Sequence, residues 1–457
     1  MPDESSVSLN RRDFLGLVAA GGGAMLLGGP PHAAASPARQ GTRPNIIYIS
    51  ADDLGYGDLS GYGRADFQTP VLDSLAAAGT RFTQAYSIAP ICTPTRVGFM
   101  TGRYPARHAV GLREPLTLSD ADRRLGLDPA QPTVSSLLRD AGYINALFGK
   151  WHLGMRREFH PNRHGFHEFF GPLTGAVDYA AHHDVMGAPD LYRNDEPVRV
   201  EGYLTDVLAD EAVKFIRARR EPFFLSHQGT APHAPWQRRG DAPVRTDPPV
   251  PGYNVGPGDR FPDMVRALDE AVGRILAAIA EQGMADRTLI IFTSDNGGMQ
   301  HSNMGGLARG KGQVWEGGIR VPAFVRWPGV IPAGVTTTQV ATTLDWSATI
   351  LAAAGVAQLP THPFDGMNLI RVLAGREPAR ERTIFWRIAQ RVRQGAVRQG
   401  RWKYLRDEDG EYLFDLVLDP GERKDRKADE PARFQRLEAA YGAWEREMLP
   451  PVTLSGS

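Results

Sequence analysis

The chain has 457 residues with 52 Lys+Arg and 52 Asp+Glu, so its formal net charge is zero, and 42% of its residues are hydrophobic. The balanced charge excludes the strongly positive field of a sequence-independent nucleic-acid-binding protein, and the hydrophobic content excludes a disordered chain. The single cysteine, Cys92, excludes a disulfide within the chain.

Residues 1–35 have the pattern of a twin-arginine signal peptide. Arg11 and Arg12 precede a glycine-rich apolar stretch, residues 14–29, and three small residues at 33–35 suit a cleavage site. The apolar stretch is shorter than the roughly 18 to 20 residues of a spanning helix, so we expect no stable membrane span. The pattern predicts a periplasmic or secreted protein that uses the twin-arginine export machinery. An uncleaved anchor or a disordered tail is the alternative.

The first half of the remaining chain begins with a predicted buried strand, residues 45–50, because this apolar run is continuous and ends at acidic residues. A helix is predicted from Pro70 to about Leu75, with Thr69 as its N-cap. Thr133 and Gly142 bracket another helix.

Strands and helices continue to alternate in the second half. We predict helices over 205–219 and 263–282 and strands over 222–227 and 288–294. The longer helix carries apolar residues at spacings of three and four. This alternation predicts an α/β fold with a large, mainly parallel sheet between layers of helices. Segments 156–202 and 240–258 lack periodicity and are expected to form long surface loops.

A different pattern starts near residue 381. Short strands with charged turns are predicted over 383–387, 394–404 and 411–416, followed by a helix over 431–448. The chain is therefore expected to divide into a large α/β domain, residues 43–380, and a small C-terminal α+β subdomain, residues 381–457, with an antiparallel sheet and one helix.

Two acidic motifs follow predicted strands. Asp52-Asp53 ends the first strand, and Asp295-Asn296 ends the strand over 288–294. Ligands gather beyond the C-terminal ends of strands in such sheets, and hard oxygen ligands suit Ca²⁺ or Mg²⁺. Each motif alone is more often a turn or a helix cap. The pair together favours a metal site.

Cys92 lies next to Arg96 at the N-terminus of a predicted helix that runs to about Thr101, and this position is expected to lower the pKa of the thiol. A buried structural cysteine is the alternative. The run Cys92-Thr93-Pro94-Thr95-Arg96 resembles the signature of the type I sulfatases, a formylglycine-dependent, arylsulfatase-like family of the alkaline phosphatase superfamily. Further similar motifs contain Asp52-Asp53, Gly149-Lys150-Trp151-His152, Pro232-His233, Ser294-Asp295-Asn296-Gly297, Gly310-Lys311-Gly312 and Arg401-Trp402-Lys403-Tyr404.

The resemblance implies a set of site residues. It implies that a formylglycine-generating enzyme converts Cys92 to Cα-formylglycine, and that Ca²⁺, or less favourably Mg²⁺, is bound. The implied metal ligands are Asp52, Asp53, Asp295, Asn296 and the modified residue 92. The implied catalytic residues are Cys92, Arg96, Lys150, His152, His233 and Lys311, of which Lys150, His233 and Lys311 also bind the substrate. Thr174 and Asp178 are candidates for one further sulfate contact, and Asn145 and Phe148 depart from the family pattern.

The resemblance implies a sulfuric ester hydrolase that acts on an aryl or carbohydrate sulfate. Arg96 and Lys150 would hold the hydrated aldehyde with His152 beside it, and His233 or Lys311 would protonate the leaving alcohol. Three alternatives remain open at this point: a phosphate or phosphonate ester hydrolase on the same scaffold, a non-catalytic binder of sulfated glycans, and a cysteine hydrolase that pairs Cys92 with His233.

Overall fold

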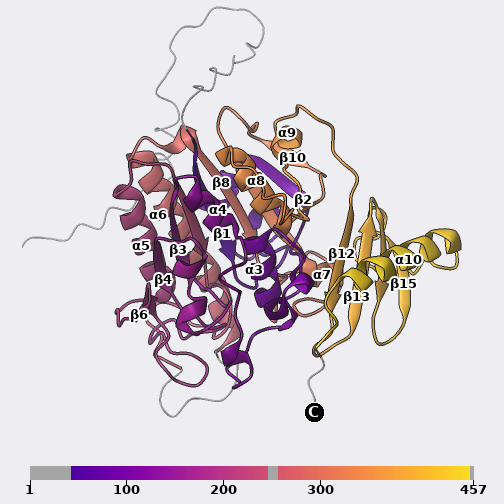
Figure 1. Ribbon diagram of the computed structural model, residues 1–457, viewed down its shortest axis with the longest axis horizontal. Coiled ribbons are helices and arrows are strands. Elements are labelled where there is room, and N and C mark those ends of the chain that lie inside the picture. Colours follow the sequence, from indigo (N-terminus) through magenta and orange to yellow (C-terminus); the bar gives the residue numbers. More distant parts are fainter. Residues whose placement is uncertain (1–42, 245–255, 453–457) are drawn as a thin grey trace, which may run out of the picture. The chain divides into compact units, whose positions relative to one another are not determined.

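The structure is a computed structural model that describes residues 43–244 and 256–452 (Figure 1). The predicted signal peptide and part of the predicted loop over 240–258 lie outside the described residues. Among the residues described, no helix combines the length and apolarity that crossing a membrane requires.

The main sheet has 11 strands among the described residues. Ten of them follow one another across the sheet in the order β10 (Val335–Thr337), β2 (Thr80–Tyr86), β9 (Arg320–Arg326), β8 (Thr288–Ser294), β1 (Asn45–Ala51), β7 (Phe223–Gln228), β3 (Ile144–Gly149), β4 (Glu168–Gly171), β5 (Tyr192–Arg193) and β6 (Glu196–Pro197), while β11 (Ala341–Thr342) also pairs with β2. Strands β8, β1, β7, β3 and β4 are parallel, and β9 is antiparallel to both of its neighbours. The predicted mainly parallel sheet is confirmed.

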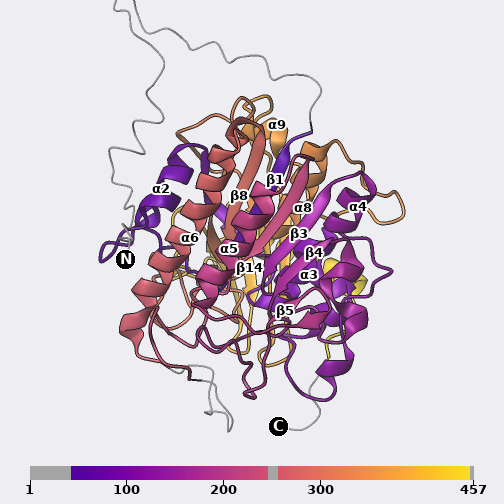
Figure 2. The same ribbon diagram turned by 90° about the vertical axis from the view of Figure 1, so that its left-hand side faces the viewer.

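Helices cover both faces of this sheet, and strand β1 shows why. Its residues alternate between two apolar clusters, with Ile47 and Ile49 in one and Ile46 and Tyr48 in the other, as the period of two in a strand requires. The first cluster includes residues of α2 (Pro70–Ala77), α5 (Leu204–Arg217) and α6 (Phe261–Glu281), and Figure 2 shows α5 and α6 across that face. The second includes residues of α3 (Cys92–Thr101), α4 (Val134–Asp140), α8 (Thr343–Ala354) and α9 (Ile370–Leu373).

Short helices occupy several connections. They are α7 (Glu316–Ile319) and the 3₁₀ helices η1 (Ser60–Tyr62), η2 (Pro105–Arg107), η3 (Ala109–Leu112), η4 (Asp122–Arg124), η5 (Arg157–Phe159), η6 (Pro161–His164), η7 (Gly258–Arg260) and η8 (Ala285–Arg287).

The predicted antiparallel C-terminal sheet is also present. It consists of β12 (Thr383–Ile388), β13 (Gln394–Gln399), β14 (Trp402–Arg406) and β15 (Glu411–Asp415), and α10 (Pro431–Glu447) packs Leu437 and Tyr441 against it. The single strand predicted over 394–404 is wrong, because the chain turns at Gly400, whose φ is 57°, and forms the β13–β14 hairpin.

Two further expectations differ from the structure, and some strands were not expected at all. Segment 156–202 is not only loop, since it contributes β4, β5 and β6 to the main sheet. Strands β2 and β9 were not predicted. Helix α2 begins at Pro70 as expected, but Thr69 makes no capping hydrogen bond with its side chain. Instead Asp269 of α6 accepts hydrogen bonds from the N–H groups of Val71 and Leu72, at 3.2 and 2.8 Å.

Candidate active site and metal centre

Four neighbouring parallel strands place the candidate residues at one edge of the main sheet. Asp52-Asp53 follow β1 and Asp295-Asn296 follow β8, while Lys150 follows β3 and His233 lies beyond the end of β7. Since parallel strands end at the same edge, residues far apart in the sequence meet there. Asp53 N–H donates to Asp295 Oδ1 at 3.3 Å, and Asn296 Nδ2 donates to Asp53 Oδ1 at 2.8 Å.

Three cationic side chains pair with the three carboxylates of this edge. Lys150 Nζ lies 2.8 Å from Asp52 Oδ2, Arg96 Nη2 lies 2.9 Å from Asp295 Oδ2, and Lys311 Nζ lies 2.7 Å from Asp53 Oδ1. Burial opposes ionisation of Asp53, but Lys311 and His233 beside it bring its pKa below the usual value. Burial raises the pKa of Asp295, and the nearby Asp52 raises it further. These pairs leave the cluster without net charge.

Cys92 is the first residue of α3 and is buried against a histidine. Its Sγ lies 3.3 Å from His152 Nδ1, and His152 Nε2 donates to the carbonyl of Leu116 at 2.9 Å, which leaves Nδ1 as the acceptor toward Cys92. The expected low thiol pKa is wrong, since burial raises the pKa of Cys92 despite the nearby Lys150 and Lys311. The pairing with His152 also argues against a cysteine hydrolase built from Cys92 and His233.

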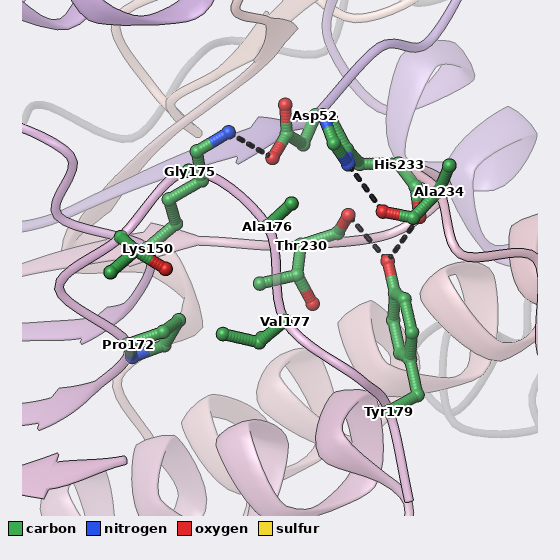
Figure 3. A pocket seen from close by; sticks show the side chains of 11 residues that line it. Asp52, Lys150, Pro172, Gly175, Ala176, Val177, Tyr179, Thr230, His233 and Ala234 are labelled. Carbon is green, nitrogen blue, oxygen red and sulfur yellow. Dashed lines mark hydrogen bonds and ion pairs between the residues drawn. The ribbon is translucent and has the colours of Figure 1, made fainter. Parts of the chain in front are cut away.

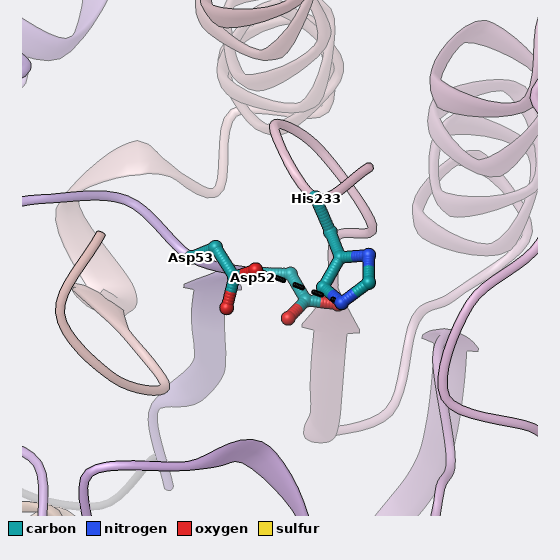
Figure 4. Close-up of side chains that lie close together, drawn as sticks. All are labelled: Asp52, Asp53 and His233. Carbon is teal, nitrogen blue, oxygen red and sulfur yellow. Dashed lines mark ion pairs between the residues drawn. The ribbon is translucent and has the colours of Figure 1, made fainter. Parts of the chain in front are cut away.

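His233 faces the acidic residues from beyond β7 (Figure 4). Its Nδ1 donates to the carbonyl of Ala234 at 2.6 Å, and its Nε2 lies 3.6 Å from Asp53 Oδ2. Burial lowers the pKa of His233 well below its usual value, and Lys311 acts in the same direction. Neutral His233 therefore presents an unprotonated Nε2 to the carboxylates.

The oxygen atoms at this edge fit a divalent cation. One atom each of Asp52, Asp53 and His233 lie within 4.8 Å of one another. In the described part of the chain, Asp52 Oδ1 and Asn296 Oδ1 are buried without a hydrogen-bond partner. Leaving a buried oxygen unpaired costs about 1 to 3 kcal/mol, and a hard cation would satisfy both atoms. The donor set is thus compatible with Ca²⁺ or Mg²⁺.

A small cavity lies beside Asp52, Lys150 and His233 (Figure 3). Its opposite wall is formed by Pro172, Thr174, Gly175, Ala176, Val177 and Tyr179. Thr174 does line the cavity, but its hydroxyl donates to Asp190. Asp178 is absent from this wall, and its Oδ1 accepts hydrogen bonds from the N–H groups of Ala180 and Ala181. The structure therefore favours Thr174 over Asp178 as a residue that faces the cavity.

Gln228, the last residue of β7, was not identified in the sequence. Its Oε1 accepts a hydrogen bond from Arg96 Nη1 at 3.0 Å, and the carbonyl of Lys150 accepts one from the same nitrogen at 2.9 Å. These contacts hold the guanidinium toward Asp295. The sequence did hold a signal for Gln228, because a polar residue at the C-terminal end of a buried strand is the same pattern that identified Asp52.

Comparisons with known proteins agree with this geometry. The family model described as Sulfatase matches residues 44–356, and the model described as N-sulphoglucosamine sulphohydrolase, C-terminal, matches residues 310–438. Arylsulfatase A of Bos taurus is 36% identical over 85% of this chain and 78% of its own length. N-acetylgalactosamine-6-sulfatase of Homo sapiens is 35% identical over 72% of this chain, and the match covers 66% of that protein.

A solved structure is similar along most of both chains. The crystal structure of Ps i-CgsB matches with a TM-score of 0.81 and 31% identity, and the match covers 91% of this chain and 96% of that one. The family model spans more than half of the chain and includes Asp52, Cys92, Lys150, His233, Asp295 and Lys311. The chain belongs to the sulfatase family of sulfuric ester hydrolases.

Proposed function

We propose that this protein hydrolyses sulfate esters of saccharides through Cα-formylglycine made from Cys92 and a bound Ca²⁺. The observation that carries the proposal is the convergence of three carboxylates, three cations and Cys92 at one buried sheet edge. The saccharide class is supported by relatives. One is named N-acetylgalactosamine-6-sulfatase, and Ps i-CgsB, 30% identical in that structure, was solved in complex with k-i-k-neocarrahexaose.

The balance of charges in the site supports the proposal of an anionic substrate. Asp52, Asp53 and Asp295 balance Arg96, Lys150 and Lys311, so a divalent cation would leave the site with two positive charges. Asp52, Asp53, Asp295 and Asn296 would hold this cation, which when bound would stabilise the negative charge that develops on the sulfuryl oxygens. Formylglycine at position 92 would supply, in its hydrated form, an oxygen nucleophile.

The chain's own residues supply the proton chemistry. His152 is held with Nδ1 toward position 92, and burial lowers its pKa well below the usual value, with Lys150 contributing, so His152 can accept a proton from a group at that position. Lys311 carries a proton in the resting site, because the nearby Asp53 raises its pKa against the effect of burial. The two candidates for protonating the leaving alcohol are Lys311 and His233. We assign this role to Lys311, because Lys311 carries a proton beside Asp53 whereas His233 is neutral in the resting site.

Substitution of Cys92 tests the proposal. We expect wild-type protein to hydrolyse a chromogenic aryl sulfate and a sulfated oligosaccharide, and Cys92→Ala to lose at least roughly a thousandfold in kcat. Cys92→Ser should release at most one equivalent of alcohol, because its sulfated serine lacks a second hydroxyl to expel the sulfate.

Mass spectrometry of the peptide that contains residue 92 gives an independent readout, with an aldehyde expected in place of the thiol. Wild-type turnover in Cys92→Ala would contradict the proposal. Faster turnover of a matched phosphate or phosphonate ester would point to the phosphate alternative, and glycan binding without turnover by fully modified protein would point to a binder.

We also propose that the protein is periplasmic or secreted after twin-arginine export, and that a formylglycine-generating enzyme acts on it. The twin arginines and the small residues at 33–35 support the export route. Sequencing of the mature N-terminus tests it, with cleavage expected near Ala35.

A further inference from the structure

The segment that carries Lys311, residues 310–319, is fixed to the active site at several points. Lys311 N–H donates to the carbonyl of Gly298 at 2.9 Å, and Gly312 N–H donates to the carbonyl of Pro90 at 2.7 Å. Gly297 N–H donates to the carbonyl of Gly318 at 2.9 Å. The segment therefore contacts both the residue that follows Asn296 and the loop that precedes Cys92.

The other side of the same segment is held by the small C-terminal sheet and by the loops that follow β14 and β15. Gln394 Oε1 accepts a hydrogen bond from Val314 N–H at 2.9 Å, and Asp407 Oδ2 accepts one from Trp315 Nε1 at 3.2 Å. Glu422 Oε2 accepts one from Glu316 N–H at 2.6 Å. Three consecutive residues of the segment thus depend on acceptors that lie 80 or more positions later in the chain.

A buried ion cluster lies at this junction. Lys403 Nζ lies 3.1 Å from Glu316 Oε1 and 2.7 Å from Glu422 Oε1, and all three side chains are 0% exposed. Tyr86 donates a hydrogen bond to Glu316 Oε2 at 2.7 Å. Burying such ions gives little net stability compared with apolar side chains of similar volume. The cluster therefore differs from an apolar contact in the geometry that it imposes on these residues, and not in the stability that it adds.

Close backbone packing links the position of residues 316–318 to the active site. A Cβ at Gly297 would lie 1.9 Å from the carbonyl oxygen of Gly317, and one at Gly318 would lie 2.0 Å from that of Gln313. At such separations the backbones are in direct contact. A shift of residues 316–318 would therefore displace Gly297, whose neighbour is Asn296, as well as the turn that begins at Lys311.

We propose that the C-terminal sheet and the loop that follows β15 position Lys311 and Asn296 for catalysis through Lys403 and Glu422, which act as positioning residues on the segment 310–319. The catalytic part of this inference rests on the proposed sulfatase function. The alternative is that the cluster only joins two parts of the fold. If the cluster positions the segment, loss of the cluster changes both the segment and the turnover of folded protein. If the cluster only joins two parts of the fold, its loss changes stability alone.

Substitutions of Glu422 separate these cases. Glu422→Met removes the acceptor for Glu316 N–H but leaves Lys403 and Glu316 as a balanced pair, so the protein should fold. Glu422→Gln keeps an oxygen acceptor, and it is a close replacement because burial raises the pKa of Glu422 toward its neutral form. Arg406→Met is the control, since it removes an ion pair of the same sheet, with Glu445 of α10, that does not contact the segment.

Each variant would be measured for hydrogen exchange of the peptide over 310–319 and for kcat per folded molecule. In Glu422→Met we expect exchange at least tenfold faster and kcat roughly ten- to a hundredfold lower, since small misplacements of a catalytic group have effects of that size. Glu422→Gln should remain within about threefold of wild type in both. Arg406→Met should lower the melting temperature but change neither the hydrogen exchange of residues 310–319 nor kcat.

Unchanged exchange in Glu422→Met, or an equal change in Arg406→Met, would overturn the positioning role. If wild-type protein hydrolyses no sulfate ester, the proposed function fails, and hydrogen exchange alone still decides whether the C-terminal sheet holds the segment.

Discussion

Asp53 and His152 hold their backbones in the left-handed region, with φ of 67° and 57°. Residues other than glycine enter this region at a cost on the order of 1 to 3 kcal/mol, so the surrounding contacts must stabilise it. Lys311 contacts the Asp53 carboxylate, and Leu116 fixes the ring of His152. The fold thus holds Asp53, a proposed metal ligand, and His152, a proposed catalytic residue, in uncommon backbone conformations.

Buried histidines with a lowered pKa should make stability depend on pH, and His227 is one whose contribution can be measured. His227 in β7 is 1% exposed, and burial lowers its pKa to about 4. Above pH 6.5 it is neutral in both the folded and the unfolded chain, but between pH 6.5 and 4 only the unfolded chain gains the proton. The free energy of unfolding should fall over this window by on the order of 3 kcal/mol from this group.

Urea unfolding of His227→Leu and wild type at pH 7 and pH 4.5 measures this contribution. We expect the variant to lose less stability than wild type between the two pH values. Equal losses would show that His227 does not remain neutral in the folded protein.

At the scale of elements, helix α2 shows how one element depends on another. Its first free N–H groups donate to Asp269 of α6, and Thr69 uses its hydroxyl for Ser60 and Asp73. A long helix therefore supplies the cap of a short one. The start of α2 is fixed by a contact between residues about 200 positions apart.

Removing this cap should destabilise the protein modestly. Asp269→Ala is expected to lower the free energy of unfolding by about 0.5 to 2 kcal/mol, the usual effect of losing a capping side chain. Asp269→Asn retains one oxygen acceptor and should lose less. Thermal or urea unfolding measures both, and equal effects of the two variants would contradict a capping role.

The elements differ in how far the sequence predicts them. Continuous apolar runs predicted β1 and β8 because these strands are buried on both faces and follow the rule for parallel sheets. Strands β5 and β6 have two residues each, too few for any period, and exist because they extend the edge beyond β4. The β13–β14 hairpin was missed because Gly400-Arg401 is a weak turn signal between similar runs.

Most of the residues that meet at this sheet edge were identified in the sequence, and their catalytic and metal-binding roles stay predictions. Parallel strand ends explain why Asp52 and Asp295 meet, and the remaining residues came from motifs that resemble those of a known family. Gln228 and Glu422 could not be found in this way, because their roles depend on which distant side chain or N–H group each one contacts.

At the scale of the whole molecule, the site draws on segments from Asp52 to Lys311, and Glu422, in the loop after β15, contacts the segment that carries Lys311. A ligand that joins several of these segments should stabilise the entire fold. By mass action, Ca²⁺ at a hundred times its Kd would add about 2.7 kcal/mol to the free energy of unfolding.

Calorimetry with chelator and with added Ca²⁺ tests this linkage. We expect chelation to lower the melting temperature and Ca²⁺ to restore it, with a smaller effect of Mg²⁺. Asn296→Ala removes one of the unpartnered oxygens and should reduce the shift, whereas Asp269→Ala should leave the shift intact. A shift of equal size in Asn296→Ala would place the cation elsewhere.

The burial of Cys92 also restricts when that residue can be altered. Cys92, at the start of α3, is 2% exposed and its Sγ contacts His152, so another enzyme's active site cannot surround the thiol once the protein has folded. The proposed formylglycine-generating enzyme would therefore have to reach the thiol on a nascent or unfolded polypeptide. If the chain leaves the cell interior already folded, the chemistry at position 92 has to be finished before departure.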